Sequence, residues 1–226
     1  MGFYGYCVVP RAHTVPEGLL GINHSPVSSR EVHGVAVWHS DIDRPEPGVE
    51  AIKAHNQVVE AALTDAITPV PLRFGQWSTE TEPFDRVISE KAAWYEERLS
   101  KFAGALEFGI RVASPERQAP AQDVRAIPAE SGIEYMRRLQ ERARATEAAE
   151  GESVRIRGRI TEVMKMVVRE ELFEDARTPH GILTVAHLVS RRHFDEYHER
   201  ASTLRTAFPE LRFLVSGPWV PYSFAA

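Results

Sequence analysis

Histidine is the residue type in this sequence that could most readily bind a metal ion or carry a proton near neutral pH. The chain contains nine histidines, but few fall at spacings that bring two imidazoles together. His33 and His39 lie six residues apart in a predicted strand over 30–39, which separates them by about 20 Å and rules out a shared ion. His193 and His198 lie five residues apart on a predicted helix, so their side chains point to different faces. These four histidines predict no metal site.

Three further histidines and one thiol are the other candidate groups for chemistry. His13 and His24 share a predicted loop, and nothing in the sequence fixes the distance between them. His55 lies on the apolar face of a predicted helix, where a core histidine that hydrogen-bonds a neighbouring carbonyl is a better interpretation than a ligand or proton carrier. Cys7 lies inside an apolar strand with no obvious base, which indicates a buried structural thiol rather than a nucleophile.

Acidic residues occur in adjacent pairs, but adjacent positions on a helix point in different directions, so the pairs are interpreted as solvated faces. These pairs are Glu96 with Glu97, Glu170 with Glu171, and Asp195 with Glu196. The phosphate-binding GxxxxGKS/T pattern is absent, as are GxGxxG, HExxH and CxxC. We therefore predict no catalytic residue, no cofactor-binding residue and no metal ligand, hence a protein that is not an enzyme and has no cofactor.

Composition excludes several partner classes. The formal net charge is −5 and the sequence pI is about 6.0. A protein that binds nucleic acid or anionic lipid usually carries an excess of positive charge instead. The single cysteine excludes an intrachain disulfide and suits a reducing compartment. The opening residues lack the basic region and apolar run of a signal peptide, and no apolar run approaches the roughly 20 residues of a membrane-spanning helix. We expect no nucleic acid, no membrane and a cytoplasmic location.

Two sets of alternating strands and helices, divided near residue 120, predict an α+β fold. In the first set, aromatic and β-branched residues or period-two alternation predict strands over 3–9, 30–39 and 106–112. Apolar residues at helical spacing predict helices over 49–67 and 81–102.

The second set begins with a charged helix predicted over 131–150. An apolar stripe that reaches Leu172 predicts a second helix after it. The remaining elements are a helix over 192–207 between strands over 182–189 and 211–215. Two strands that flank one helix, preceded by a long helix, resemble half of a ferredoxin-like unit.

A proline-rich polar stretch without periodicity predicts a linker over 116–130. We therefore expect an N-terminal α+β domain over 1–115 and a C-terminal α+β domain over 131–226, which contains the long helix and an aromatic tail. Both domains are expected to have mixed or antiparallel sheets with helices.

The segment PLRFG, residues Pro71, Leu72, Arg73, Phe74 and Gly75, is unusual because a guanidinium stands between two apolar side chains. A lone buried guanidinium is very costly, so an inward-facing Arg73 needs a carboxylate or carbonyl partner. We interpret Arg73 as a structural clamp, with direct contact to a partner protein as the alternative.

The C-terminal segment GPWVPYSF is a stiff tail in which two prolines accompany three aromatic residues, Trp219, Tyr222 and Phe224. Aromatic side chains often anchor interfaces, but a tail of this kind also commonly packs back on its own domain. The sequence leaves both outcomes open.

These segments resemble the family of gas vesicle proteins F and L. The family carries, in the same order, segments similar to YGYCVV, AIKAHNQVVEAAL, PVPLRFG, LTVAHLV and GPWVPYSF, and the resemblance covers nearly the whole chain. The chain departs from the family pattern at Val220, where the tail often has proline.

The resemblance implies an α+β protein of two domains with a ferredoxin-like C-terminal part. It implies a minor structural component or assembly factor of gas vesicles, in the cytoplasm or on the vesicle. The implied partners are the main shell protein and other accessory gas vesicle proteins, without cofactor or catalysis. The competing hypotheses are an enzyme or ligand-binding protein on a ferredoxin-like scaffold, which hosts many functions, and a general chaperone or scaffold unrelated to vesicles.

Overall fold

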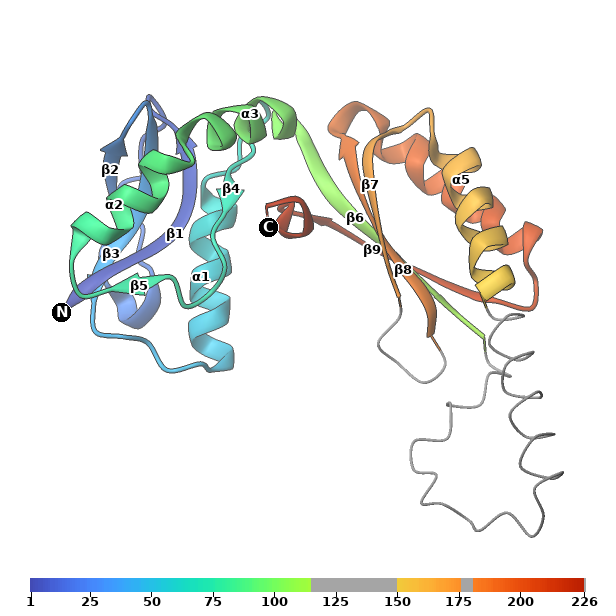
Figure 1. Cartoon of the computed structure of the whole chain (residues 1–226), viewed down its shortest axis with the longest axis horizontal. Coiled ribbons are helices and arrows are strands. Elements are labelled where there is room, and N and C mark those ends of the chain that lie inside the picture. The colour runs from blue at the N-terminus through green and yellow to red at the C-terminus, as the bar shows by residue number, and fades with distance from the viewer. Residues whose placement is uncertain (115–149, 176–180, 226) are drawn as a thin grey trace, which may run out of the picture. The chain divides into compact units, whose positions relative to one another are not determined.

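The computed structural model describes residues 1–114, 150–175 and 181–225, and these form an α+β protein with antiparallel strand pairs, as predicted (Figure 1). The chain divides into two compact units. The first comprises Met1–Glu107 with Gly217–Ala226, and the second comprises Phe108–Ser216. The predicted linker over 116–130 lies outside the described residues.

The sheet of the first unit is built around β1 (Gly2–Pro10), of which eight residues are buried. The strand order is β2-β3-β1-β4, and β5 also pairs with β1. The other strands are β2 (Ser28–Val32), β3 (Val35–Ile42), β4 (Val70–Pro71) and β5 (Trp77–Ser78). β1 pairs with β3 along its whole length in antiparallel register.

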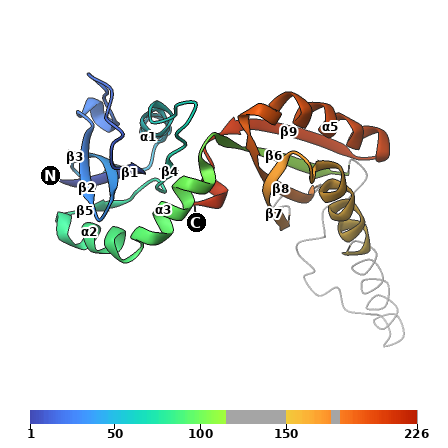
Figure 2. The same ribbon diagram turned by 90° about the horizontal axis from the view of Figure 1, so that it is seen from above.

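Helices cover both faces of this sheet. Neighbouring residues of β1 point to opposite faces, and each face contacts a different helix. Tyr4 contacts His55 of α1 (Val49–Ala61), whereas Phe3 packs against Phe84 of α2 (Thr81–Glu90) with ring centroids 4.6 Å apart. α3 (Ala92–Phe102) follows α2 directly. Figure 2 shows α1 on one side of β1 and β3, and α2 with α3 on the other.

Three local predictions in this unit were wrong. The expected strand over 30–39 is a hairpin, because His33 and Gly34 take positive φ angles of 45° and 90° in a two-residue turn between β2 and β3. The first helix ends at Ala61 rather than at 67. The helix expected over 81–102 is interrupted at Lys91, which separates α2 from α3.

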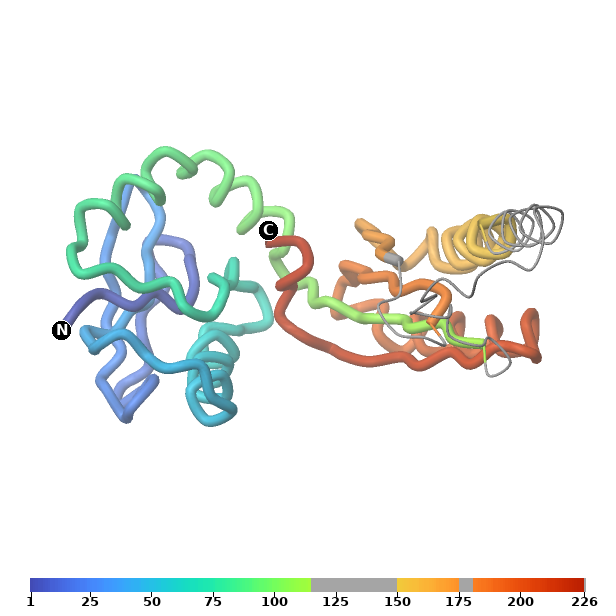
Figure 3. Tube along the Cα trace, turned by 60° about the horizontal axis from the view of Figure 1, so that its bottom comes forward, coloured from blue at the N-terminus to red at the C-terminus, as the bar shows by residue number. Residues whose placement is uncertain are grey.

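The second unit has the element order and strand order of a ferredoxin-like fold. β6 (Ala105–Ala113) is followed by helical residues 150–164, then by β7 (Val168–Asp175) and β8 (Gly181–Ser190). α5 (Phe194–Ala207) and β9 (Arg212–Trp219) complete it, and the strands lie in the order β7-β8-β6-β9. Figure 3 traces β6 and β9 side by side. Short 3₁₀ turns lie at Ile22–His24, Arg191–His193 and Tyr222–Phe224.

One hydrophobic core holds the second unit together. Alternate side chains of the strands, such as Phe108, Ile110 and Val185, meet Ile156 and Ile160 of the helical residues 150–164, and all five are buried. Tyr197 and Leu204 of α5 join the same cluster.

The structure assigns three segments differently from the sequence analysis. β6, expected in the N-terminal domain, joins the second sheet, and the division between the units falls inside it. The predicted helix that reached Leu172 ends before β7, because residues from Val168 onward pair with β8. The tail over 217–226 belongs to the first unit rather than to the C-terminal domain, because Val220 lies in the hydrophobic cluster of that unit and Tyr222 packs against it.

Candidate functional site

The PLRFG segment forms the end of the first sheet and the loop after it. Pro71 pairs with Cys7, and the Leu72 N–H donates to the Tyr6 carbonyl at 2.9 Å. The strand is short because prolines have no N–H to continue the ladder. Pro71 and Leu72 are buried and Phe74 is half-buried. The apolar residues of the segment therefore fix its position.

Arg73 is exposed and makes no hydrogen bond or ion pair with the residues that the structure describes. The predicted structural clamp is therefore wrong. Its physical reason is the alternation of an extended chain, which turns Leu72 and Arg73 to opposite sides. The alternative, direct contact of this guanidinium with a partner protein, stays a prediction.

A buried network fixes the backbone beneath Arg73. His55 Nε2 lies 3.0 Å from the Leu72 carbonyl, which only accepts, so the Nε2–H donates and Nδ1 is the acceptor. The Tyr4 hydroxyl donates to that Nδ1 at 2.9 Å and accepts from the Gly75 N–H at 3.2 Å. Gly75 has a φ of +93°, which favours glycine. This confirms the interpretation of His55 as a core histidine bonded to a carbonyl.

Burial lowers the pKa of His55 from 6.5 to about 4, and its hydrogen bond to Leu72 opposes the shift. The unfolded chain takes up a proton near pH 6.5, whereas the folded imidazole stays neutral down to about pH 4. We expect the free energy of unfolding to fall by about 3 kcal/mol as the pH falls through this window. All four tryptophans lie in the first unit, so tryptophan fluorescence in urea at a series of pH values measures this loss.

His55→Gln tests the assignment because the amide does not titrate. This variant should lose most of the decline between pH 6.5 and 4, apart from a part due to His39, whose pKa burial also lowers. His24→Gln, at an exposed histidine, is the matched control and should keep the wild-type profile. Identical profiles for His55→Gln and the wild type would show that His55 does not cause the effect.

The aromatic tail both packs back and presents a side chain. Val220 and Phe224 are buried, at 4% and 3% exposure, whereas Trp219 is 53% exposed. The Tyr222 hydroxyl donates to Asn56 Oδ1 at 2.7 Å, and burial raises the pKa of Tyr222. The N–H and hydroxyl of Ser223 donate to the two carboxylate oxygens of Glu107 at 2.9 and 2.7 Å. The tail is thus a strap that buried side chains and hydrogen bonds hold at several points. Trp219, near the start of the strap, is exposed.

The structure brings both predicted segments to one hydrophobic cluster. Phe74 and Tyr222 pack at its margin, Val220 lies within it, and Tyr4 belongs to its interior. Sequence reasoning did not identify Tyr4, Asn56 or Glu107 as supports, because these residues meet the two segments only through long-range folding.

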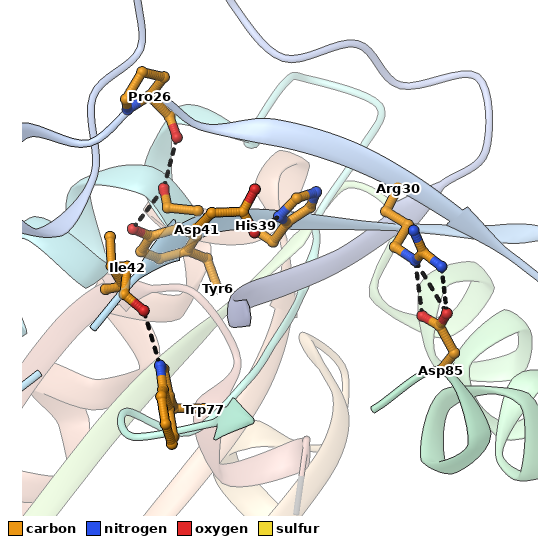
Figure 4. A network of polar contacts seen from close by, with 9 residues as sticks. Tyr6, Pro26, Arg30, His39, Asp41, Ile42, Trp77 and Asp85 are labelled. Carbon is orange, nitrogen blue, oxygen red and sulfur yellow. Dashed lines mark hydrogen bonds and ion pairs between the residues drawn. The ribbon is translucent and has the colours of Figure 1, made fainter. Parts of the chain in front are cut away.

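A second polar network links β3 to neighbouring segments of the first unit (Figure 4). The Tyr6 hydroxyl donates to Ser40 Oγ at 3.1 Å, and Ser40 donates in turn to the Pro26 carbonyl at 2.8 Å. Trp77 Nε1 donates to the Ile42 carbonyl at 3.0 Å. On the other side of the sheet, Arg30 of β2 makes an ion pair of 2.6 Å with Asp85 of α2. These contacts hold the sheet and α2 in place.

Other titratable groups serve the core of the second unit. The Tyr197 hydroxyl lies 2.8 Å from Nδ1 of the fully buried His187, whose Nε2 lies 3.6 Å from Glu171. The nearby His187 imidazole, together with a hydrogen bond of 2.7 Å from the Thr161 hydroxyl, holds the pKa of Glu171 below its usual value. The residues described in the structure contain no group of three or more potential metal ligands. In the first unit, burial in the hydrophobic core raises the pKa of the Cys7 thiol.

No helix among the described residues is both long and apolar enough to cross a lipid bilayer.

Comparisons with known proteins give a consistent result. The family model described as gas vesicle synthesis protein GvpL/GvpF matches residues 2–226. Gas vesicle protein L of Streptomyces sp. (strain CB03234) is 27% identical over 192 residues, covering 78% of this chain and 69% of the relative. Gas vesicle protein F of the same organism is 28% identical and covers 99% of both chains. The crystal structure of gas vesicle protein GvpF from Microcystis aeruginosa matches the whole chain and 99% of that structure, with a TM-score of 0.75 and 22% identity.

Proposed function

This chain belongs to the gas vesicle synthesis protein GvpL/GvpF family, and we propose that it is a non-enzymatic accessory protein of gas vesicle assembly that binds the main shell protein. Other accessory gas vesicle proteins are its further expected partners. The observation that carries the proposal is the presentation of Trp219 and Arg73 on rigid supports in one unit.

These two residue types are the ones that most often dominate binding energy at protein interfaces. Trp219 is more than half exposed, although the residues that follow it are buried or hydrogen-bonded. Arg73 is exposed on a loop that His55 and Tyr4 hold from beneath. Because both supports are ordered before binding, little conformational entropy is lost when a partner docks.

A shell subunit that forms a gas-filled compartment needs an apolar surface, and exposed apolar surface associates non-specifically before assembly. An accessory protein that binds this surface transiently would prevent such association. Trp219 supplies apolar contact area for this purpose, and Arg73 supplies a planar hydrogen-bond donor that fixes orientation.

Deletion of the gene in a vesicle-forming cell tests the requirement for this protein. We expect the deletion strain to lack vesicles and the wild-type gene to restore them, measured by electron microscopy and by flotation. A matched exposed variant, Val87→Ala, should restore them as well, because Val87 is an exposed residue of α2 and belongs to neither segment. Normal vesicles in the deletion strain would contradict the proposal.

A further inference from the structure

An exposed apolar pair on α1 lies beside both the PLRFG loop and the strap. Its members, Val49 and Ile52, are 68% and 46% exposed. Residues three and four apart on a helix are neighbours, so Ile52 lies next to His55 and Asn56. His55 bonds the loop at the Leu72 carbonyl, and Asn56 accepts the hydrogen bond of the strap. The loop and the strap therefore both reach α1 within one turn of the apolar pair.

The side chain of Arg73 projects on the side of the sheet that α1 covers. A Cβ on Gly5 would lie 2.7 Å from the Phe84 ring and 2.8 Å from Leu72, so Leu72 points toward the face that α2 covers. Arg73 is the next residue of an extended chain, so it points to the opposite face. Figure 1 shows the chain between β4 and β5 passing alongside α1. Arg73 and the apolar pair are thus exposed on the same side of the sheet.

The charge of Arg73 has no partner among the described residues, which include the whole first unit up to Ala225. Other arginines of this unit are paired, since Arg11 binds Glu31 and Arg30 binds Asp85. The loop that carries Arg73 is held from beneath by buried hydrogen bonds. Its guanidinium is therefore held near a fixed position with all its donors available to a partner.

We infer that the main shell subunit binds this surface through a segment in which a carboxylate stands beside apolar side chains. The carboxylate binds Arg73 with two parallel hydrogen bonds. The apolar side chains contact Val49 and Ile52 and remove them from water. This inference rests on the proposed function and specifies the chemistry that the shell subunit presents to this protein.

The charge of the first unit favours a single carboxylate over a strongly acidic partner surface. The unit contains fifteen acidic and nine basic residues, so its field repels a partner with many negative charges. One carboxylate opposite Arg73 forms a charge-assisted pair and adds little to this repulsion.

Titration of a fluorescently labelled main shell subunit with variants of the full chain tests the inference. We expect Arg73→Glu to weaken binding by about tenfold or more, because a charge-assisted pair is lost and a repulsion is added. Arg86→Glu is the matched control, because Arg86 is exposed on α2, on the other side of the sheet, and this variant should bind as the wild type does. Ile52→Ser should weaken binding by about fivefold, whereas Val87→Ser, at a similarly exposed position, should not.

Charge reversal in the shell subunit identifies the carboxylate. Each acidic residue of the shell subunit is replaced by arginine in turn, and each variant is titrated with the Arg73→Glu chain. We expect one replacement to restore binding to Arg73→Glu and to weaken binding to the wild-type chain, because it reverses the same ion pair.

The possible results separate this inference from the proposed function. Binding by the wild-type chain that Arg73→Glu leaves intact would overturn the inference and leave the proposed function standing. A loss of binding that no replacement in the shell subunit restores would also overturn it, because the acceptor would not be a carboxylate. Failure of the wild-type chain to bind would overturn both. Each variant must unfold in urea as the wild type does, and Arg73→Gln replaces Arg73→Glu if the latter does not.

Discussion

Phe224→Ala is expected to lower the free energy of unfolding of the first unit by about 3–5 kcal/mol, although Phe224 is only two residues from the end of the chain. Terminal residues usually contribute little, but this side chain is 3% exposed and the residues beside it are tied to Asn56 and Glu107. Loss of the ring removes its burial and leaves a cavity. Urea unfolding followed by tryptophan fluorescence measures the change, because all four tryptophans are in this unit.

Trp219→Ala is the matched control for this experiment. It removes a larger ring five residues earlier in the same tail, but from a position that is 53% exposed. We expect it to change the free energy of unfolding far less than Phe224→Ala. Equal effects from the two variants, or no effect from Phe224→Ala, would contradict the description of the tail as a buried strap.

Trp219→Ala should have its large effect on binding instead. Aromatic anchors at the centre of an interface contribute about 2 kcal/mol or more, so the affinity for the main shell subunit should fall about thirtyfold or more. Val87→Ala, which also shortens a half-exposed apolar side chain in the first unit, should leave the affinity unchanged. Arg73→Ala should weaken binding without lowering the melting temperature, because Arg73 is exposed.

This second prediction separates a binding role from a structural role. If Trp219→Ala unfolds the protein, Trp219 is a packing residue. If the variant remains folded and binds the shell subunit as tightly as the wild type does, the contact lies elsewhere on the molecule. Titration of a fluorescently labelled shell subunit with each variant distinguishes these results.

Local patterns predicted the α+β class and many of the individual elements. β1 and β8 appear close to where their runs of apolar residues placed them, and α5 appears close to where helical spacing placed it. The hairpin between β2 and β3 was missed because its turn contains only His33 and Gly34, a weak signal beside a continuous apolar run. The residues from Val168 were assigned to a helix because an apolar stripe alone does not show where a helix ends.

Long-range partners could not be predicted from local patterns. The alternation of β6 predicted a strand correctly but did not say which sheet it joins, and it lies beside β8 and β9 of the second unit. The same limit applied to the tail, whose composition fits equally well with packing back and with exposure. In the structure Phe224 is buried, whereas Trp219 is more than half exposed.

The sequence identified the candidate site as two unusual segments, but it did not identify the residues that support them. Unusual composition identified the PLRFG loop and the aromatic tail, and both contribute to one hydrophobic cluster. The role of Arg73 was misassigned because the sequence does not show which way an isolated extended residue points. The roles of Tyr4 and Glu107 depend on hydrogen bonds across 71 and 116 residues of sequence, which no local pattern encodes.

Co-purification of the main shell subunit with the tagged full chain from co-expressing cells tests the proposed function most directly. We expect the wild-type protein and Val87→Ala to retain the untagged shell subunit, and the double variant Arg73→Ala with Trp219→Ala to retain little of it. Retention by the double variant at the wild-type level would show that the shell subunit binds another surface. Absence of the shell subunit from the wild-type eluate, with both proteins present in the cell extract, would contradict the central claim that this chain binds the gas vesicle shell protein.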